Sequence, residues 1–197
     1  MIKLFNKWDT ENITVIDKGL QGYINLKPVI VPLTFGRNAK QQFYKSRYTI
    51  VERLILKLMV PGHRGKKHRL TSRHCTGKFM KRYKIVEKVF SMIEAKLKKN
   101  PVEVFVKSIE NSTPREEINT IEYGGAKYPQ PVECSPQRRI DIALRQMVQG
   151  AYSKSFNTKR KFEDCLMDEI VYAYNNDQKS TAIAKKIELE RQADASR

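Results

Sequence analysis

Acidic residues are absent from one stretch of this chain, and that gap constrains the fold more than any other feature. Residues 61–84 hold nine Lys and Arg residues and no Asp or Glu, whereas residues 85–197 hold 19 basic and 17 acidic ones. Of the net charge of +17, 15 units lie in the first 84 residues. Like charges repel in a compact state. We therefore expect a nearly neutral, foldable C-terminal body and an N-terminal half whose charge a polyanion neutralises.

Nucleic acid is the polyanion that suits this excess, because each phosphate contact releases condensed counterions. The predicted RNA-binding residues of the basic stretch are Arg64, Lys66, Lys67, Arg69, Arg73, Lys78, Lys81 and Arg82. Glycines at 62, 65 and 77 would let the stretch follow a phosphate path closely. The alternative interpretation is a solvated loop that binds nothing.

The rest of the chain is dominated by helical periodicity. Apolar residues recur at helical spacing over residues 47–60, 79–98, 102–110, 136–151, 161–174 and 181–193. Ser135 is the expected N-cap of the fourth helix, and Pro101 and Pro136 suit first turns. Residues 1–45 lack this pattern and are interrupted by Pro and Gly. We expect them to form an irregular basic arm that lies on a partner.

Between the third and fourth predicted helices, the pattern becomes that of two strands around Gly124-Gly125. Both glycines can adopt the positive φ that a two-residue hairpin turn requires. Pro129 and Pro131 cannot donate ladder hydrogen bonds, so the second strand must be an edge. The fold class predicted from these patterns is all-α, with six helices and a protruding β-hairpin. Because an isolated ribbon is marginal in water, we expect another molecule to brace it.

Catalytic motifs are not recognisable. A phosphate-binding loop of the nucleotide-hydrolase type ends in Gly-Lys-Ser/Thr, but here Gly77-Lys78 is followed by Phe79. A zinc site at the clustered His63, His68, His74 and Cys75 is disfavoured, because the last two are adjacent in sequence. The neighbouring acids Glu116-Glu117 and Asp168-Glu169 point in different directions and are interpreted as solvated or locally ion-paired. We expect no catalytic residue, metal or cofactor, and therefore no enzyme.

Three scattered cysteines, Cys75, Cys134 and Cys165, do not suggest a disulfide framework. No apolar run approaches the roughly 20 residues of a membrane span, and the N-terminus lacks a signal-peptide pattern. These features predict a cytosolic or nuclear protein that has no membrane partner.

Further RNA-contact candidates lie on both sides of the basic stretch. Arg37, Lys40, Lys45 and Arg47 flank Phe43, Tyr44 and Tyr48, and cationic and aromatic planes together can bind phosphates and stack on unpaired bases. The alternative places Phe43 and Tyr48 in the core. At the hairpin tip, the candidates are Tyr123, Gly124, Gly125, Lys127 and Tyr128. Arg138 and Arg139 begin the fourth helix, where exposed amides also favour anions.

One segment closely resembles a known family: Pro-Val-Glu-Cys-Ser-Pro-Gln-Arg-Arg-Ile-Asp-Ile-Ala-Leu-Arg (131–145) is similar to universal ribosomal protein seven of the small subunit. Its eukaryotic cytosolic member is numbered five. The similarity extends to Ile-Val-Glu-Arg-Leu (50–54), Tyr-Gly-Gly (123–125) and Cys-Leu-Met-Asp-Glu (165–169). It covers residues 35–60 and 78–197, and the opening residues 2–8 look like the eukaryotic N-terminal extension.

The resemblance implies an N-terminal extension over 1–45 and a helical rRNA-binding domain over 46–197, with the hairpin at 115–134. It also implies binding to the 3′ major (head) domain of the small-subunit rRNA, support of head assembly, and a hairpin near exit-site tRNA and the departing mRNA. Basic residues before and within the first helix, together with Arg138 and Arg139, would correspond to RNA-facing positions. Neighbouring ribosomal proteins of the head and platform would be partners. The implied location is the cytoplasmic ribosome, with nuclear or nucleolar passage if the protein is eukaryotic. The basic loop 61–78 is longer than the eukaryotic pattern, so no family contacts are assigned to it.

Two other classes of function have different requirements. A free nucleic-acid-binding regulator would need a dimer face and a base-reading helix, and an RNA-modifying enzyme would need a cofactor loop or a catalytic cluster. None of these features is recognisable in the sequence.

Overall fold

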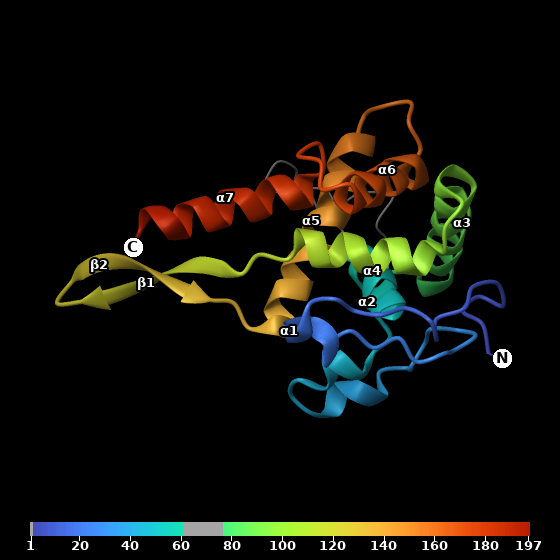
Figure 1. Ribbon diagram of the computed structural model, residues 1–197, viewed down its shortest axis with the longest axis horizontal. Coiled ribbons are helices and arrows are strands. Elements are labelled where there is room, and N and C mark those ends of the chain that lie inside the picture. Colours follow the sequence, from blue (N-terminus) through green and yellow to red (C-terminus); the bar gives the residue numbers. More distant parts are fainter. Residues whose placement is uncertain (1, 61–76) are drawn as a thin grey trace.

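The structure, a computed structural model, describes residues 2–60 and 77–197. Most of this part of the chain is helical, and one antiparallel hairpin projects from it (Figure 1). The long helices are α2 (Ile50–Leu58), α3 (Phe79–Leu97), α4 (Pro101–Ser112), α5 (Pro136–Ser155), α6 (Phe162–Tyr174) and α7 (Thr181–Ala195). The prediction of a helical domain with a hairpin is confirmed. Six helices were expected, but the described residues form seven, because the short α1 (Lys18–Gln21) lies in the segment expected to be irregular.

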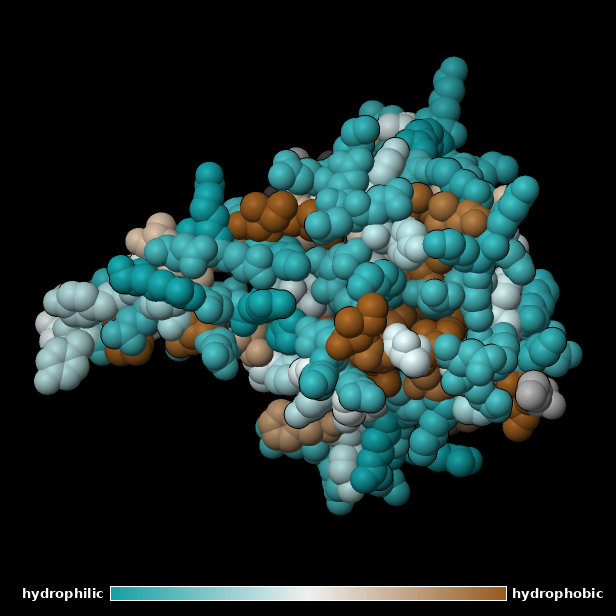
Figure 2. All heavy atoms as spheres, in the orientation of Figure 1, coloured by the Kyte–Doolittle hydropathy of each residue, from teal (hydrophilic) through white to brown (hydrophobic). Residues whose placement is uncertain are grey.

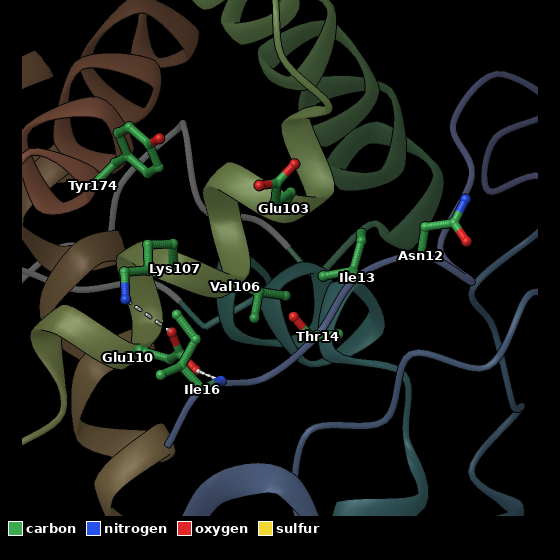
Figure 3. A pocket seen from close by; sticks show the side chains of 9 residues that line it. All are labelled: Asn12, Ile13, Thr14, Ile16, Glu103, Val106, Lys107, Glu110 and Tyr174. Carbon is green, nitrogen blue, oxygen red and sulfur yellow. Dashed lines mark hydrogen bonds and ion pairs between the residues drawn. The ribbon is translucent and has the colours of Figure 1, made fainter. Parts of the chain in front are cut away.

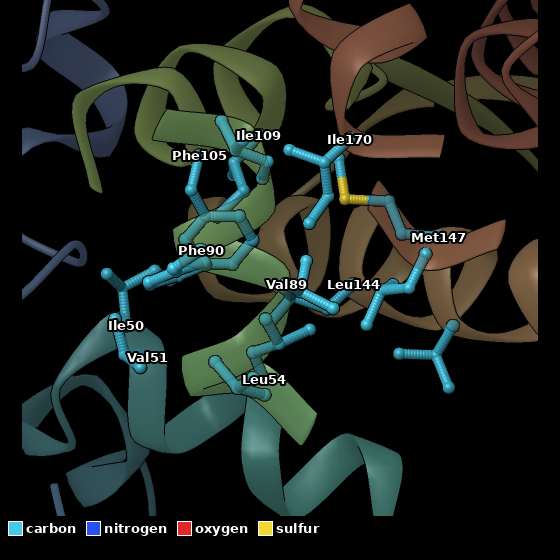
Figure 4. Close-up of a cluster of buried hydrophobic side chains, with 14 of the residues drawn as sticks. Ile50, Val51, Leu54, Val89, Phe90, Phe105, Ile109, Leu144, Met147 and Ile170 are labelled. Carbon is cyan, nitrogen blue, oxygen red and sulfur yellow. The ribbon is translucent and has the colours of Figure 1, made fainter. Parts of the chain in front are cut away.

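The core lies where α2 to α6 meet (Figure 4). Phe90 of α3 and Phe105 of α4 pack with their ring centroids 5.7 Å apart. Leu54, Leu144 and Ile170 bring α2, α5 and α6 to the same cluster, and all three are fully or almost fully buried. These residues belong to the apolar stripes seen in the sequence, so the stripes predicted the core-facing sides of the helices.

The N-terminal segment packs on the same core, which differs from the expected arm on a partner. Leu4, Phe5 and Trp8 are buried, and Phe5 lies against Tyr83 of α3 with ring centroids 4.7 Å apart. The indole N–H of Trp8 donates a hydrogen bond to Glu94 at 2.9 Å. Three large apolar side chains within five residues bury enough surface to hold the segment down. The domain boundary expected at residue 45 stays a prediction.

Local chemistry sets several helix ends. Asn100 caps α4 by accepting the N–H of Val102 at 3.0 Å, and Pro101 occupies the first turn, as predicted. Ser135 occupies the N-cap position of α5, but its side chain makes no capping hydrogen bond.

Glu169 is fully buried rather than solvated. Its Oε1 accepts hydrogen bonds from the backbone N–H and the hydroxyl of Thr181, both at 2.5 Å, and thereby anchors the start of α7 to α6.

The hairpin consists of β1 (Glu116–Tyr123) and β2 (Ala126–Glu133), paired from Glu116 with Glu133 to Tyr123 with Ala126. Gly124 and Gly125 have φ of 59° and 82°, so the predicted two-residue turn with positive φ is confirmed. Helix α7 runs beside the base of the ribbon (Figure 1). Arg197 forms an ion pair with Glu116 at 2.5 Å, and Glu190 accepts the N–H of Arg115 at 3.1 Å. The outer part of the ribbon is left exposed.

No helix in residues 2–60 and 77–197 combines the length and the apolar character that crossing a membrane requires. Figure 2 agrees with this finding, since the face that it shows is mainly hydrophilic, with apolar groups scattered over it.

Candidate nucleic-acid interface

The segment before α2 presents aromatic side chains to solvent. Phe35 is 80% exposed and Phe43 is 69% exposed, and both have positive φ, of 50° and 66°. Exposure of Phe43 excludes the alternative that it is a core residue, whereas Tyr48 is half-buried. Glu52 of α2 fixes the beginning of this segment, because its Oε1 accepts both the N–H and the hydroxyl of Thr34 at 2.8 Å. A short buried anchor thus supports an exposed aromatic loop.

Cations surround these aromatic rings. Arg37 and Lys40 lie in the 3-10 helix η1 (Arg37–Lys40) and are exposed. In the 3-10 helix η2 (Tyr44–Arg47), the guanidinium of Arg47 lies 3.7 Å from the centroid of the Tyr44 ring. Lys45 forms an ion pair with Asp141 of α5 at 2.6 Å. We name the exposed surface formed by residues 35–47 the aromatic–basic loop. Stacked planar groups next to cations are suited to unpaired nucleotides.

The outer hairpin has two different faces. Directly paired residues share a face, so Ile121 and Tyr128 lie on the same face as Tyr123 and Ala126. Tyr123 is 81% exposed, and Ile121 and Tyr128 are exposed as well. The opposite face carries the paired Glu122 and Lys127. The tip therefore offers aromatic surface on one side and a charged pair on the other.

The two arginines at the start of α5 have intramolecular partners. Arg138 donates two hydrogen bonds to the carboxylate of Glu117, at 2.5 and 2.7 Å. Arg139 donates to the carbonyl of Pro114 at 3.0 Å and to Asp17 at 2.8 Å, and its side chain is mostly buried. Arg139 thus ties the N-terminal segment to the base of the hairpin rather than facing solvent. Its partners are far away along the chain, so no local pattern of residues indicates this arrangement.

The basic stretch is only partly described. Lys78 and Lys81 are exposed at the start of α3, as a contact residue requires. Arg82 is fully buried, so RNA cannot reach it in this conformation; it lies one residue beyond Lys81, on the side of α3 that faces the protein. Arg64, Lys66, Lys67, Arg69 and Arg73 lie outside the described residues, as do the histidines and Cys75 of the disfavoured zinc cluster.

A group of cations lies between α2 and α5, and it includes Lys45, a predicted RNA-contact residue, and the basic residues of the first predicted helix. Arg53 of α2 and Lys45 form ion pairs with Asp141 of α5, at 3.2 and 2.6 Å. Lys57 of α2 interacts electrostatically with Asp141 and with Arg145 of α5. The sequence signal for this group is the spacing of four residues within each helix. This spacing puts Arg53 and Lys57 on the same side of α2, and Asp141 and Arg145 on the same side of α5. Nothing in the sequence indicates that α2 and α5 pack against each other.

A surface pocket of about 240 Å³ lies between residues 12–16, α4 and Tyr174 of α6 (Figure 3). Its most prominent carboxylate, Glu110, accepts the backbone N–H groups of Ile16 at 2.6 Å and Asp17 at 3.1 Å. Lys107 forms an ion pair with the same side chain at 3.4 Å. These polar groups hold the N-terminal segment on α4, and their arrangement is structural.

The two described cysteines are buried and free. Burial, followed by the neighbouring charge of Glu117, raises the pKa of the Cys134 thiol to about 11. Burial also raises the pKa of Cys165. Because the thiolate is the nucleophile, neither group is suited to covalent chemistry at neutral pH. Within the described ranges, no three His, Cys, Asp or Glu residues are grouped so as to hold a metal ion.

Comparison with known proteins gives consistent results. The family model described as ribosomal protein S7p/S5e matches residues 20–197. The small ribosomal subunit protein uS7 of Nanoarchaeum equitans is 52% identical over 196 residues, covering 100% of this chain and 99% of its own length. The proteins of the same name from Methanothrix thermoacetophila and Methanosphaera stadtmanae are 44% and 45% identical, over 100% and 97% of this chain and 100% and 96% of their own lengths. All three relatives are archaeal, so they do not support the nuclear passage expected of a eukaryotic member.

Proposed function

The chain belongs to the ribosomal protein S7p/S5e family of structural, non-enzymatic proteins, and from this membership we propose that it is a structural component of the small ribosomal subunit. Relatives that carry the name of this subunit protein align over nearly their whole length. Its partners in that role are ribosomal RNA and other proteins of the subunit, in the cytoplasm.

The RNA that it binds is the 3′ major (head) domain of the small-subunit rRNA, and binding supports assembly of the head. The observation that carries this proposal is the exposed aromatic–basic loop, where Phe35 and Phe43 stand beside Arg37 and Lys40. An exposed phenylalanine costs hydration free energy unless something covers it. Stacked bases would cover the rings while phosphates neutralise the cations. Lys78 and Lys81 extend the basic surface, and the basic loop 61–78 reaches additional RNA.

The hairpin serves a different part of the same function. Its exposed tip, with Tyr123, Gly124, Gly125, Lys127 and Tyr128, approaches exit-site tRNA and the departing mRNA. This proposal is supported by the projection of the ribbon away from the helices (Figure 1) and by the aromatic face that it leaves uncovered. Neighbouring proteins of the head and platform are the remaining partners.

Binding to RNA fragments tests the proposal directly. The full chain is titrated with transcripts of the 3′ major domain and, as a matched control, of the 5′ domain of the same rRNA. We expect tighter binding to the 3′ major domain at physiological salt and a strong decrease in affinity as salt rises. Equal affinity for the two transcripts would contradict recognition of the head.

Sedimentation distinguishes this function from the two alternative classes. Tagged protein in an extract is centrifuged through a high-salt gradient, and we expect it to migrate with small subunits. A peak at the top of the gradient would favour a free regulator or an RNA-modifying enzyme.

A further inference from the structure

The two outer edges of the hairpin differ in what they offer to a further strand. In an antiparallel ribbon, pairs that hydrogen-bond to each other alternate with pairs whose backbone N–H and C=O groups point outward. The N–H of Cys134 donates to the carbonyl of Arg115 at 2.9 Å, next to the pair of Glu116 with Glu133. Arg115 and Cys134 therefore form a hydrogen-bonded pair, and the alternation assigns every pair from there to the turn.

Both prolines of β2 lie at outward-pointing positions. Counted from the base of the ribbon, the pairs of Ile118 with Pro131 and of Thr120 with Pro129 are the non-hydrogen-bonded ones. The nitrogens of the two prolines thus face the outer edge of β2, where a further strand would need N–H donors, and proline has none. The outer edge of β2 is closed to another strand.

The outer edge of β1 has no such block. Its outward-pointing residues are Ile118, Thr120 and Glu122. Within residues 2–60 and 77–197, no backbone group outside the ribbon forms a hydrogen bond with these three. Ile118 is half-buried, while Thr120 and Glu122 are exposed. An edge with unpaired N–H and C=O groups is a template for the addition of a strand.

The ribbon is acidic, although the whole chain is strongly basic. Residues 116–133 hold four Glu and one Lys, a net charge of −3, against +17 for the chain. Glu116 and Glu117 form ion pairs with arginines of the same molecule. Among the residues that the structure describes, Glu122 takes part in no ion pair. The open edge therefore carries an uncompensated negative charge near its tip.

We infer that β1 receives, as a third strand, an extended segment rich in Lys or Arg from another protein of the small subunit. This inference rests on the proposed function and assigns the edge of the ribbon that a protein partner occupies. Side chains on neighbouring strands interact directly, so Glu122 faces a basic side chain of the added strand. The strand takes the edge and leaves the face that carries Tyr123 and Tyr128 uncovered.

Two other occupants fit this edge less well. A second copy of the chain would bring its own β1 glutamates next to these, and like charges on neighbouring strands are destabilising. A nucleic-acid backbone would bring phosphates to an acidic edge, which is repulsive as well. A basic protein segment satisfies both the outward backbone groups and the charge of Glu122.

Hydrogen exchange of single amides tests the inference. Rates are measured in the free full-length chain and in the same chain within purified small subunits. The amides of Thr120 and Glu122 should exchange about tenfold or more slowly in the subunit, because the added strand accepts their hydrogen bonds. Lys127 is the matched internal control, since it is paired with Glu122 and its amide points to the closed edge of β2. Its rate should stay nearly unchanged.

The two proposals fail in different ways. Unchanged rates at Thr120 and Glu122 would overturn the inference. Equal slowing at Lys127 would overturn it too, because a broad cover rather than a strand would then lie on the ribbon. Both results leave the proposed function intact, since preference for the 3′ major domain transcript tests that function separately.

A pair of variants at Thr120 tests the role of the backbone. Thr120→Pro removes an outward N–H, as the natural prolines do on β2, whereas Thr120→Val keeps it. In subunits, only the proline variant should return the amide of Glu122 to its rate in the free chain. The inward amide of Asn119 should exchange in the free proline variant as in the wild type, which shows that the ribbon still forms. Equal protection of Glu122 in both variants would contradict strand addition.

A second pair of variants, at Glu122, tests the charge of the partner without altering the backbone. Glu122→Lys should speed the exchange of Thr120 in subunits, because it places a cation next to a basic strand, and Glu122→Gln should have a smaller effect. Slower exchange in Glu122→Lys would show that the occupant is an anion. Unchanged exchange would show that charge does not select the occupant, and either result overturns the assignment of a basic segment.

Discussion

Two carboxyl groups, those of Glu52 and Asp141, respond to their surroundings in opposite ways. Burial raises the pKa of Glu52, and the hydrogen bonds from Thr34 only partly offset it. Burial also acts to raise the pKa of Asp141, but the hydrogen bond from Lys45 and the charge of Arg53 outweigh it and hold this pKa below its ordinary value. The two residues should therefore give opposite dependences of stability on pH.

Glu52→Gln tests the raised pKa. A raised folded-state pKa contributes stability below the unfolded pKa and loses it as pH rises through the folded value. The variant does not ionise, so its free energy of unfolding should improve relative to the wild type as pH rises from about 4 to 7. Urea unfolding at several pH values measures this difference. A difference that is constant with pH, or that changes in the opposite direction, would contradict the assignment.

Asp141→Asn should behave in the opposite way. A depressed folded-state pKa contributes stability above the unfolded pKa and loses it as pH falls through the folded value. The variant also leaves the buried Arg53 without its ionised partner, so we expect a loss of about 1–3 kcal/mol at pH 7. The loss should begin to shrink below about pH 4, where the unfolded chain takes up a proton, and should go on shrinking as pH falls through the lower folded-state pKa and the wild-type carboxyl group is protonated too. The same urea titrations measure it, and a loss that is unchanged at low pH would show that charge is not its cause.

At the scale of elements, α5 and α7 meet at a position that has no room for a side chain. A Cβ built on Gly150 would lie 1.7 Å from Thr181 Oγ1, and this hydroxyl is held by Glu169. Gly150→Ala should therefore destabilise the protein by about 1–3 kcal/mol. Thermal unfolding measures the effect. Gly22→Ala is the matched control, because a Cβ there meets nothing within 4 Å and φ is −76°; no loss of stability is expected there.

The two faces of the hairpin lead to a functional prediction. Tyr123→Ala/Tyr128→Ala removes the aromatic face, and Glu122→Ala/Lys127→Ala removes the paired charges on the other face. If bases stack on the tyrosines, each contact contributes about 1–3 kcal/mol, so the first variant should raise reading-frame errors in a reporter assay while the second does not. Both should still assemble into small subunits. Loss of assembly in the tyrosine variant would show that the ribbon is structural.

Local chemistry explains which elements could be predicted from the sequence. The hairpin turn follows from Gly124-Gly125, because the required φ values are a property of the residues themselves. The start of α4 follows from Asn100-Pro101 for the same reason. Glu169 could not be assigned, since its role depends on Thr181, which reaches it only through the packing of α6 and α7. The same limit applies to Arg139 and Asp17, whose ion pair joins segments that are far apart in the sequence.

Over the whole molecule, the boundary between the positively charged half and the nearly neutral half does not coincide with a boundary of the hydrophobic core. Charge divides the chain near residue 84, and this division indicated the RNA partner. Burial does not follow it, because Leu20 and Ile24, in the positively charged half, lie in the same cluster as Phe105 and Ile170. Charge counts describe what a surface attracts, whereas apolar spacing describes what folds together. The residues that precede the aromatic–basic loop are anchored in the core, whereas the loop itself is exposed.

The docking of the N-terminal segment gives a test of whether the described chain unfolds as one unit. Trp8 is the single tryptophan, so its fluorescence reports on this segment, while far-UV circular dichroism reports on the helices. Because Trp8 packs on Phe90 with ring centroids 5.7 Å apart, the two urea transitions should coincide. Trp8→Ala should lower the free energy of unfolding by about 3–5 kcal/mol, whereas the exposed Ile2→Ala should change it by less than about 0.5 kcal/mol. A fluorescence transition at lower urea would mean that the segment detaches before the helices unfold, as a separate arm would.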